Sequence, residues 1–124
     1  MPQGLEKLIF KQGYCYLANM NPTYKSKPGK VRPVVVVQAS ELIDADIPGV
    51  VALPITSQIQ KPDLLRVHIL PTAYLRIKTE SDVLINQVLT LDQSLFLQEL
   101  GRIEADDFQK IMNGLKFLLG IRNF

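Results

Sequence analysis

The sequence predicts a mainly-β fold, a small β-barrel followed by a C-terminal α-helix. Strand-length apolar segments recur about ten residues apart, and turns containing glycine or proline separate them. The last part of the chain instead carries apolar residues at helical spacing. A chain of 124 residues can bury one core, so we expect a single domain over residues 1–124.

The first predicted strand covers residues 13–19, "GYCYLAN". Its alternation predicts one face with Tyr14, Tyr16 and Ala18 and another with Cys15 and Leu17. A loop over residues 20–32 follows, and the pairs "NP" and "PG" within it are turn signals.

The next predicted strand, residues 33–38, is "PVVVVQ", which is apolar on both faces and therefore central and covered. After a loop or short helix at 40–46, residues 50–56 form a second buried strand. Residues 64–70 alternate, so Leu65, Val67 and Ile69 are expected opposite Arg66, His68 and Leu70. Residues 81–91 are predicted as the next strand.

The C-terminal helix is predicted from Asp106 to Leu119. Its apolar stripe is formed by Phe108, Ile111, Met112, Leu115, Leu118 and Leu119, and we assign it to packing in the core or in a dimer. Asp106 and Asp107 suit the first turn because of the helix dipole, and Gly120 falls where a C′ glycine is expected. Gly114 costs up to about 1 kcal/mol relative to alanine, so tertiary packing must hold the helix.

Composition excludes several classes of protein. No apolar run reaches the length of a membrane span, and the N-terminus lacks the apolar core of a secretory signal. The single cysteine, Cys15, fits a reducing compartment, and we interpret it as a small core residue. The expected location is the cytoplasm.

Charge is distributed unevenly along the chain. Residues 1–40 contain six lysines and arginines against Glu6, whereas the remainder has an excess of acidic residues. Four of the cations, Lys25, Lys27, Lys30 and Arg32, lie in or next to the loop that precedes the buried strand. This asymmetry predicts a basic surface for an anionic partner.

Five segments, in order and spacing, resemble the MazF/PemK-like toxins of type II toxin–antitoxin pairs. They are "YLANMNPT" (16–23), "PGKVRPVVVVQ" (28–38), "LPITSQ" (53–58), "SDVLINQVLTLD" (81–92) and "LKFLLGI" (115–121). The resemblance covers about residues 13–121, and residues 1–12 are expected to be an N-terminal extension.

The resemblance implies a small SH3-like β-barrel with short peripheral helices and a C-terminal α-helix, usually as a homodimer. The implied activity is cleavage of single-stranded RNA, usually mRNA, without a metal or other cofactor, which arrests growth. It also implies a cognate antitoxin protein that covers the RNA groove.

The family motifs place the catalytic residues at Arg32 and Thr56. Expected RNA-binding residues are Tyr24, Lys25, Lys27, Lys30, Ser57, Gln58 and Gln87. Arginine suits a phosphoryl group because its planar fork binds two oxygens and stays charged. A threonine hydroxyl can donate to a third oxygen, Tyr24 can stack on a base, and lysines would make binding sensitive to salt.

Three positions depart from the family pattern. Lys27 and Asn86 stand where many relatives carry acidic residues, and Leu89 replaces an arginine. The general base is therefore not visible. Asp82 is the nearest alternative, and the motif assigns no base to His68.

Two other functions are weighed against the ribonuclease. The first is a relative that keeps the fold and binds antitoxin or RNA but cleaves poorly, which the three departures favour. The second is a toxin of the same fold that inhibits a protein target, such as the relatives that poison gyrase. Those toxins use a tryptophan near the C-terminus, and this chain contains no tryptophan.

Overall fold

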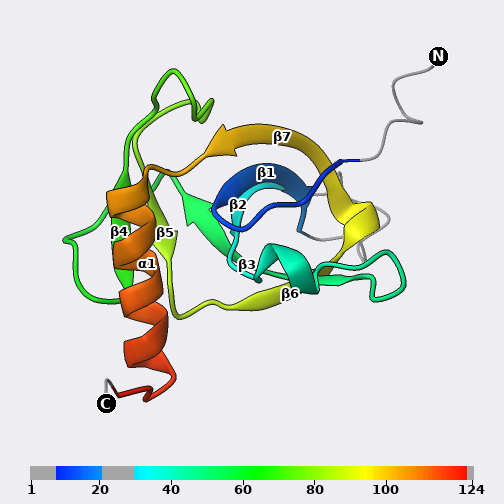
Figure 1. The fold of residues 1–124 in the computed structure, drawn as a ribbon. Coiled ribbons are helices and arrows are strands. Elements are labelled where there is room, and N and C mark those ends of the chain that lie inside the picture. Colours follow the sequence, from blue (N-terminus) through cyan, green and yellow to red (C-terminus); the bar gives the residue numbers. More distant parts are fainter. Residues whose placement is uncertain (1–7, 21–29, 123–124) are drawn as a thin grey trace.

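The computed structural model describes residues 8–20 and 30–122 (Figure 1). Within these residues the chain forms strands, two short 3₁₀-helices and one α-helix. In chain order they are β1 (Tyr14–Asn19), β2 (Val31–Val36), η2 (Ser40–Leu42), β3 (Gly49–Thr56), β4 (Arg66–Ile69), β5 (Ser81–Leu84), β6 (Leu89–Asp92), η3 (Gln93–Leu95), β7 (Phe96–Arg102) and α1 (Ala105–Leu118). The predicted mainly-β class, short helices and C-terminal helix are confirmed.

The strands pair antiparallel in a seven-stranded sheet of order β4-β5-β3-β2-β1-β7, with β6 also paired to β3. The sheet curves strongly (Figure 1), but among the described residues its end strands, β4 and β7, do not pair with each other. The segment that follows β4 contacts β7 in place of β4 itself. Leu75 forms an isolated bridge with Gly101, and the Arg102 N–H donates to the Tyr74 carbonyl at 2.9 Å. The predicted barrel is thus a curved sheet that β-pairing does not close.

Two strands differ from the sequence-based expectation. The predicted strand 81–91 is divided into β5 and β6 by a turn in which the Gln87 N–H donates to the Leu84 carbonyl at 3.3 Å. β7 was not predicted. Its pairing with β1 contains two register shifts, and such irregular pairing obscures the period-two pattern from which a strand is recognised.

The central strands separate two apolar clusters. One includes Val35 and is covered by α1 through Ile111, whereas the other includes Val34 and Val36. β2 is therefore buried on both faces, as predicted. The alternation predicted for β1 is also confirmed: the first cluster holds Cys15 and Leu17, and the second holds Tyr14, Tyr16 and Ala18. In β4, Val67 and Ile69 face the first cluster, also as predicted.

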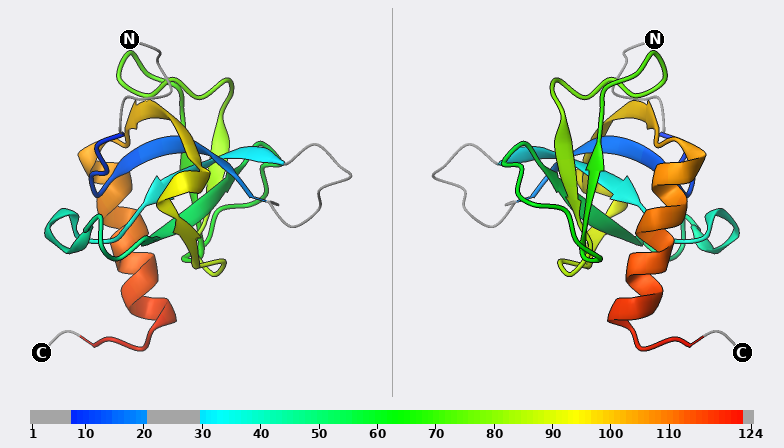
Figure 2. Two further views of the ribbon diagram at one scale, coloured as in Figure 1. Left: turned by 90° about the vertical axis from the view of Figure 1, so that its right-hand side faces the viewer. Right: turned by 90° about the vertical axis from the view of Figure 1, so that its left-hand side faces the viewer.

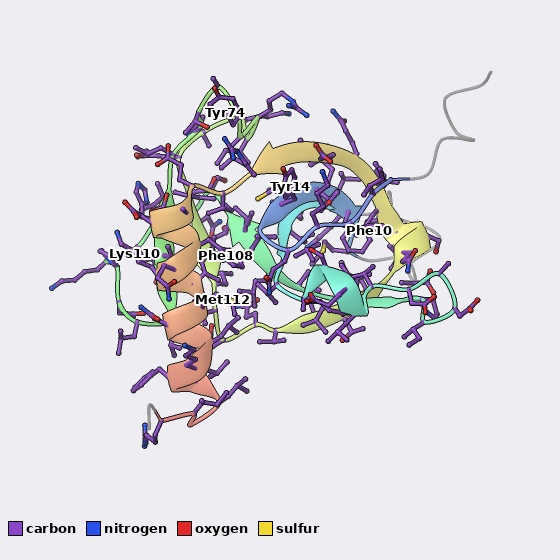
Figure 3. All side chains as sticks on the ribbon, in the orientation of Figure 1. Phe10, Tyr14, Tyr74, Phe108, Lys110 and Met112 are labelled. Atoms are coloured by element: carbon purple, nitrogen blue, oxygen red, sulfur yellow. The ribbon has the colours of Figure 1, made fainter. Side chains whose placement is uncertain are left out.

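The helix α1 lies along one side of the sheet, beside β4 and β5 (Figures 1 and 2). Phe108 and Met112 point toward the strands, and Lys110 lies on another side of the helix (Figure 3). The predicted stripe is buried or partly buried only as far as Leu115. Leu118 and Leu119 are exposed because the last turn extends past the strands (Figure 2). No helix in the described part of the chain is long and apolar enough to cross a membrane.

The two ends of α1 follow the sequence-based prediction. Asp106 and Asp107 lie in the first turn. Gly120 has a φ of 71°, and its N–H donates to the Phe117 carbonyl at 3.2 Å, while the next N–H, of Ile121, donates to Lys116 at 2.9 Å. This pair of hydrogen bonds is a Schellman motif, which requires a left-handed residue at C′.

Candidate functional site

Arg32 and Thr56 lie at the same end of neighbouring strands. β2 and β3 pair from Val34 opposite Pro54 to Val36 opposite Ala52, and Arg32 and Thr56 each lie two residues beyond that pairing, at the same end. Residues two apart on a strand leave the same face of the sheet, so Arg32 shares the face of Val34 and Thr56 shares the face of Pro54. Arg32 is exposed and Thr56 is half-buried. The central strands therefore end in a guanidinium and a hydroxyl on one face.

Both side chains line one hollow of about 320 Å³. Its wall is completed by Met20, Lys30, Pro54, Ile55, Ser57, Gln58 and Leu84. The structure thus brings together five of the residues that sequence analysis assigned to the site: Lys30, Arg32, Thr56, Ser57 and Gln58. No hydrogen bond or ion pair joins the Arg32 guanidinium to another described residue, so its charge faces the hollow without a counterion from the described part of the chain.

The other predicted residues are not part of this hollow. Gln87 is exposed in the turn between β5 and β6 and is not among the lining residues, although Leu84 in front of that turn is. Tyr24, Lys25 and Lys27 lie outside the described residues, and their assignment to RNA binding stays a prediction.

The segment after Thr56 is shaped by local hydrogen bonds. The Thr56 Oγ1 accepts the Gln58 N–H at 3.1 Å, a turn typical of threonine at the end of a strand. The Gln58 carbonyl in turn accepts from Arg66 Nη2. Because the Thr56 oxygen is an acceptor in this turn, its own proton stays available for donation to a ligand.

Asp82 anchors the same segment from the neighbouring strand. It pairs with Thr56 across β3 and β5, and its buried carboxylate accepts from Arg66 Nε at 2.7 Å, Gln60 N–H at 3.0 Å and His68 Nδ1 at 3.0 Å. Burial alone would raise the pKa of Asp82, but these hydrogen bonds outweigh burial and hold it below the usual value. Asp82 is not among the residues that line the hollow, and its hydrogen bonds to Gln60 and Arg66 hold the segment after Thr56 in place.

His68 bridges two carboxylates. Its Nδ1 bonds to Asp82, and its Nε2 lies 3.3 Å from Glu80 Oε2. The hydrogen bond to Asp82, with a smaller contribution from Glu80, raises the pKa of His68 above its usual value. The His68 ring thus belongs to the hydrogen-bonded cluster around Asp82. It is not among the residues that line the hollow.

Arg32 also lines a second hollow, which sequence analysis missed. Its volume is about 270 Å³, and it shares Arg32, Ile55 and Ser57 with the first. It adds the cations Arg76 and Lys78, which come from the segment between β4 and β5. The sequence signal was "RIKTES" (76–81), a basic stretch before a strand. That stretch is far from Arg32 along the chain and gives no indication of the proximity.

The described residues provide neither a metal site nor a reactive cysteine. No group of three or more histidine, cysteine, aspartate or glutamate side chains there is arranged to hold a metal ion. Cys15 is fully buried, and burial raises the pKa of its thiol. A thiol of this kind is a poor nucleophile because the thiolate is the reactive form.

The sequence resembles a known toxin family over nearly its whole length. Residues 11–119 match the family described as PemK-like, MazF-like toxin of type II toxin–antitoxin system. The endoribonuclease MazF of Staphylococcus epidermidis is 30% identical over 117 residues, which cover 94% of this chain and 96% of that protein.

Solved structures share the fold. MazF from Deinococcus radiodurans is 23% identical with a TM-score of 0.71, and the match covers 92% of this chain and 99% of that one. A mycobacterial endoribonuclease in complex with its cognate antitoxin is 18% identical with a TM-score of 0.73, covering 93% and 99%. Because the family match spans nearly the whole chain, the protein belongs to the PemK-like, MazF-like toxins of type II toxin–antitoxin systems.

Proposed function

We propose that this toxin is a metal-independent endoribonuclease that cleaves single-stranded RNA and thereby arrests growth. The observation that carries the proposal is the hollow of about 320 Å³ that Arg32 and Thr56 share. The guanidinium has no partner among the described residues and is free to bind an anion. The likeness to a staphylococcal protein named as an endoribonuclease supports the same reaction.

RNA carries its own nucleophile, the 2′-OH next to each phosphate. In the proposed reaction the 2′ oxygen bonds to phosphorus and loses its proton, while the bond from phosphorus to the 5′ oxygen breaks and that oxygen gains a proton. Arg32 binds two phosphoryl oxygens through its planar fork and stabilises the charge that develops there. Thr56 donates its hydroxyl proton to a further oxygen.

The remaining polar residues bind the RNA on either side. We assign Lys30, Ser57 and Gln58, which line the hollow, to contacts with neighbouring nucleotides. We also propose RNA contacts for Gln87 and for three residues that precede β2 in the sequence, Tyr24, Lys25 and Lys27. The proposal includes no cofactor and no metal, because the 2′-OH and the bound guanidinium supply the nucleophile and the charge stabilisation.

A second candidate function is a relative that binds RNA and antitoxin but cleaves weakly. One observation favours it: the described residues that line the hollow include no carboxylate and no histidine. A proton acceptor for the 2′-OH is therefore not provided by these side chains. Rates distinguish the two functions, because a weak enzyme binds RNA with normal affinity but turns it over slowly.

The proposed partners are RNA, a cognate antitoxin protein and a second copy of the chain. The structure of a mycobacterial relative with its cognate antitoxin supports the antitoxin. The homodimer stays a prediction, and the exposed apolar residues at the end of α1, Phe117, Leu118 and Leu119, are available for such a contact. The proposed location is the cytoplasm, where messenger RNA is translated.

The test is cleavage of a single-stranded RNA by the purified chain in EDTA. We expect cleavage by the wild type and a loss of about 100-fold or more in kcat for Arg32→Ala, since removal of one preorganised donor lowers rates by roughly that factor. Lys110→Ala, which removes a charge outside the hollow, is the matched control. Equal rates for Arg32→Ala and the wild type would remove Arg32 from the mechanism.

A chemical control tests the nucleophile. An RNA that carries a 2′-deoxy sugar at the cleaved nucleotide should bind but resist cleavage. Cleavage of that substrate would contradict attack by the 2′-OH. Normal binding of the all-RNA substrate with very slow turnover would favour the second candidate.

A further inference from the structure

Residues 57–60, which follow Thr56, form a strap that carries part of the proposed RNA site outside the sheet. β3 ends at Thr56, and all four residues of the strap are exposed. Ser57 and Gln58 nevertheless line the hollow of about 320 Å³. Because an exposed segment beyond the end of a strand buries little apolar surface, hydrogen bonds must fix its course.

Arg66 on β4 holds this strap at Gln58. Its Nη2 donates to the Gln58 carbonyl, and the Gln58 N–H donates to Thr56 Oγ1 at 3.1 Å. Gln58 is thus held on both sides, through its carbonyl by the guanidinium and through its N–H by the threonine oxygen. The position of the Thr56 hydroxyl is therefore linked to the position of the Arg66 guanidinium through one residue.

The Arg66 side chain is itself fixed by Asp82. Its Nε donates to Asp82 Oδ2 at 2.7 Å, and the same carboxylate oxygen accepts the Gln60 N–H at 3.0 Å. Only 17% of the Arg66 side chain and 2% of the Asp82 side chain are exposed. A planar guanidinium that binds a buried carboxylate at Nε and a carbonyl at Nη2 has little freedom to turn. Arg66 and Asp82 therefore form a rigid support beside the strap.

Arg66 does not reach the proposed cleavage site directly. It is not among the residues that line either hollow beside Arg32. It lines instead a separate hollow of about 390 Å³, together with Lys110 and Asn113 of α1. A guanidinium that contacts the strap but not the RNA hollow can affect the reaction only through the groups that the strap holds.

We propose that Arg66 is a positioning residue for the proposed reaction, because it holds Gln58 so that the Thr56 hydroxyl is directed at the phosphoryl group. This inference rests on the proposed ribonuclease function and deepens it. Arg66 lies outside the five sequence segments that resemble the toxin family. Without Arg66 the Gln58 carbonyl loses its donor, the turn opens, and the hydroxyl is no longer held in line with the phosphate. A misplacement of about 1 Å in reacting groups lowers rates by as much as about 100-fold.

The first measurement is single-turnover cleavage of single-stranded RNA in EDTA. Arg66→Ala should lower the cleavage rate by about 10- to 100-fold. The Kd, measured by fluorescence anisotropy on an RNA with a 2′-deoxy sugar at the cleaved nucleotide, should change little, because cations dominate affinity for RNA. His68→Asn removes another hydrogen bond to Asp82 from the same strand. It is the matched control and should keep the wild-type rate at pH 7.

A double-variant cycle distinguishes positioning from a general loss of stability. If Arg66 acts through the Thr56 hydroxyl, Arg66→Ala should have little further effect on the rate in a Thr56→Val background, because the positioned group is already absent. A purely structural role would instead lower the rate by the same factor in both backgrounds. That result would contradict the proposal.

Chemical rescue tests the position of the guanidinium itself. Arg66 lines the hollow of about 390 Å³, so its truncation to alanine leaves a space that added ethylguanidinium can enter. Ethylguanidinium, below the concentrations that unfold the protein, should raise the rate of Arg66→Ala several-fold and in a saturable manner. Equal stimulation of the wild type would contradict rescue at this position.

Arg66→Lys tests whether charge alone is sufficient, and it keeps the proposal testable if Arg66→Ala does not fold. Lysine retains a cation beside Asp82, but its ammonium lacks the fork that spans the carboxylate and the Gln58 carbonyl. The variant should therefore fold and remain slow. A wild-type rate in Arg66→Lys would overturn the proposal.

The outcomes separate this inference from the proposed function. Cleavage by the wild type with an equal rate in Arg66→Ala, or with equal losses in Arg66→Ala and His68→Asn, would overturn the positioning role and leave the ribonuclease intact. No cleavage by the wild type would overturn the proposed function, and the positioning role with it. A slow Arg66→Ala with nearly normal Kd, rescued by ethylguanidinium, would support both.

Discussion

Thr56 and Asp82 lie opposite each other on β3 and β5, and their side chains leave the same face of the sheet. His68 on β4 lies opposite Asp82 in turn. Arg32 lies two residues before Val34, which pairs with Pro54, and so shares this face at the other end of the row. Four strands thus contribute one row of polar side chains, in which Arg32 and Thr56 face the hollow and Asp82 and His68 support it.

Asp82→Asn should destabilise the fold substantially. Only 2% of the Asp82 side chain is exposed and 17% of its partner Arg66 is, so the change leaves a largely buried guanidinium without its carboxylate. We expect a loss on the order of 3 kcal/mol in the free energy of unfolding, measured in urea. Asp92→Asn, at an exposed aspartate that accepts from Ser94, is the control and should lose much less. Equal losses in the two variants would contradict the assignment of Asp82 as the anchor.

His68 should make stability depend on pH in a defined direction. Its pKa is raised chiefly by the hydrogen bond to Asp82, so the folded protein binds the proton more tightly than the unfolded chain. The stability from this group is complete below the usual histidine pKa of about 6.5 and is lost as pH rises through the raised folded pKa. The difference in unfolding free energy between wild type and His68→Asn should therefore be larger at pH 6 than at pH 9, in denaturant titrations at the two values.

The titration of His68 gives an independent check. The chain contains a single histidine, so its NMR signal is unambiguous. Asp82→Asn should lower the pKa of His68 toward its ordinary value, because the main cause of the shift is removed. An unchanged pKa in this variant would show that Glu80 alone sets the protonation of the ring.

Thr56→Val should remove a hydroxyl donor while keeping the shape of the side chain. By analogy with deletion of one oxyanion donor, we expect kcat to fall by about 100- to 1,000-fold, or roughly 2.7–4 kcal/mol. Thr56→Ser keeps the hydroxyl and the bond from the Gln58 N–H, so it should retain most of the activity. Single-turnover cleavage distinguishes the two, and full activity in Thr56→Val would exclude the hydroxyl from catalysis.

Gly114→Ala should destabilise α1 although alanine is the better helix former. A Cβ at residue 114 would lie 2.5 Å from the Leu64 carbonyl oxygen and 3.3 Å from the Ile85 side chain. Overpacking of this kind costs about 1–3 kcal/mol, more than the roughly 1 kcal/mol gained in helix propensity. Asn113→Ala, one residue earlier and exposed, should change stability little in the same unfolding experiment. If Gly114→Ala were more stable than the wild type, α1 could move away from Leu64 and Ile85 without a loss in the free energy of unfolding, and the prediction would be wrong.

Much of the fold was predicted from local patterns. The two-faced burial of β2, the alternation of β1 and the ends of α1 follow from side-chain periodicity and from residues such as Gly120 that act within a few positions. β7 was missed because its alternation is interrupted where it pairs with β1 through two register shifts. The division of β5 from β6 was missed because "SDVLINQVLTL" contains no glycine or proline to mark the turn between them.

The residues of the candidate site were likewise only partly predictable from the sequence. From the sequence, the resemblance to the MazF/PemK-like toxins predicted that Arg32, Thr56, Ser57, Gln58 and Lys30 belong to one site, and these five residues do line one hollow. Tertiary structure alone decided that Arg76 and Lys78 stand beside Arg32 and that Asp82 supports the site rather than entering it. The physical reason is that pairing between strands and the close approach at Gly101 bring distant segments together, and no local pattern in the chain encodes such a long-range contact.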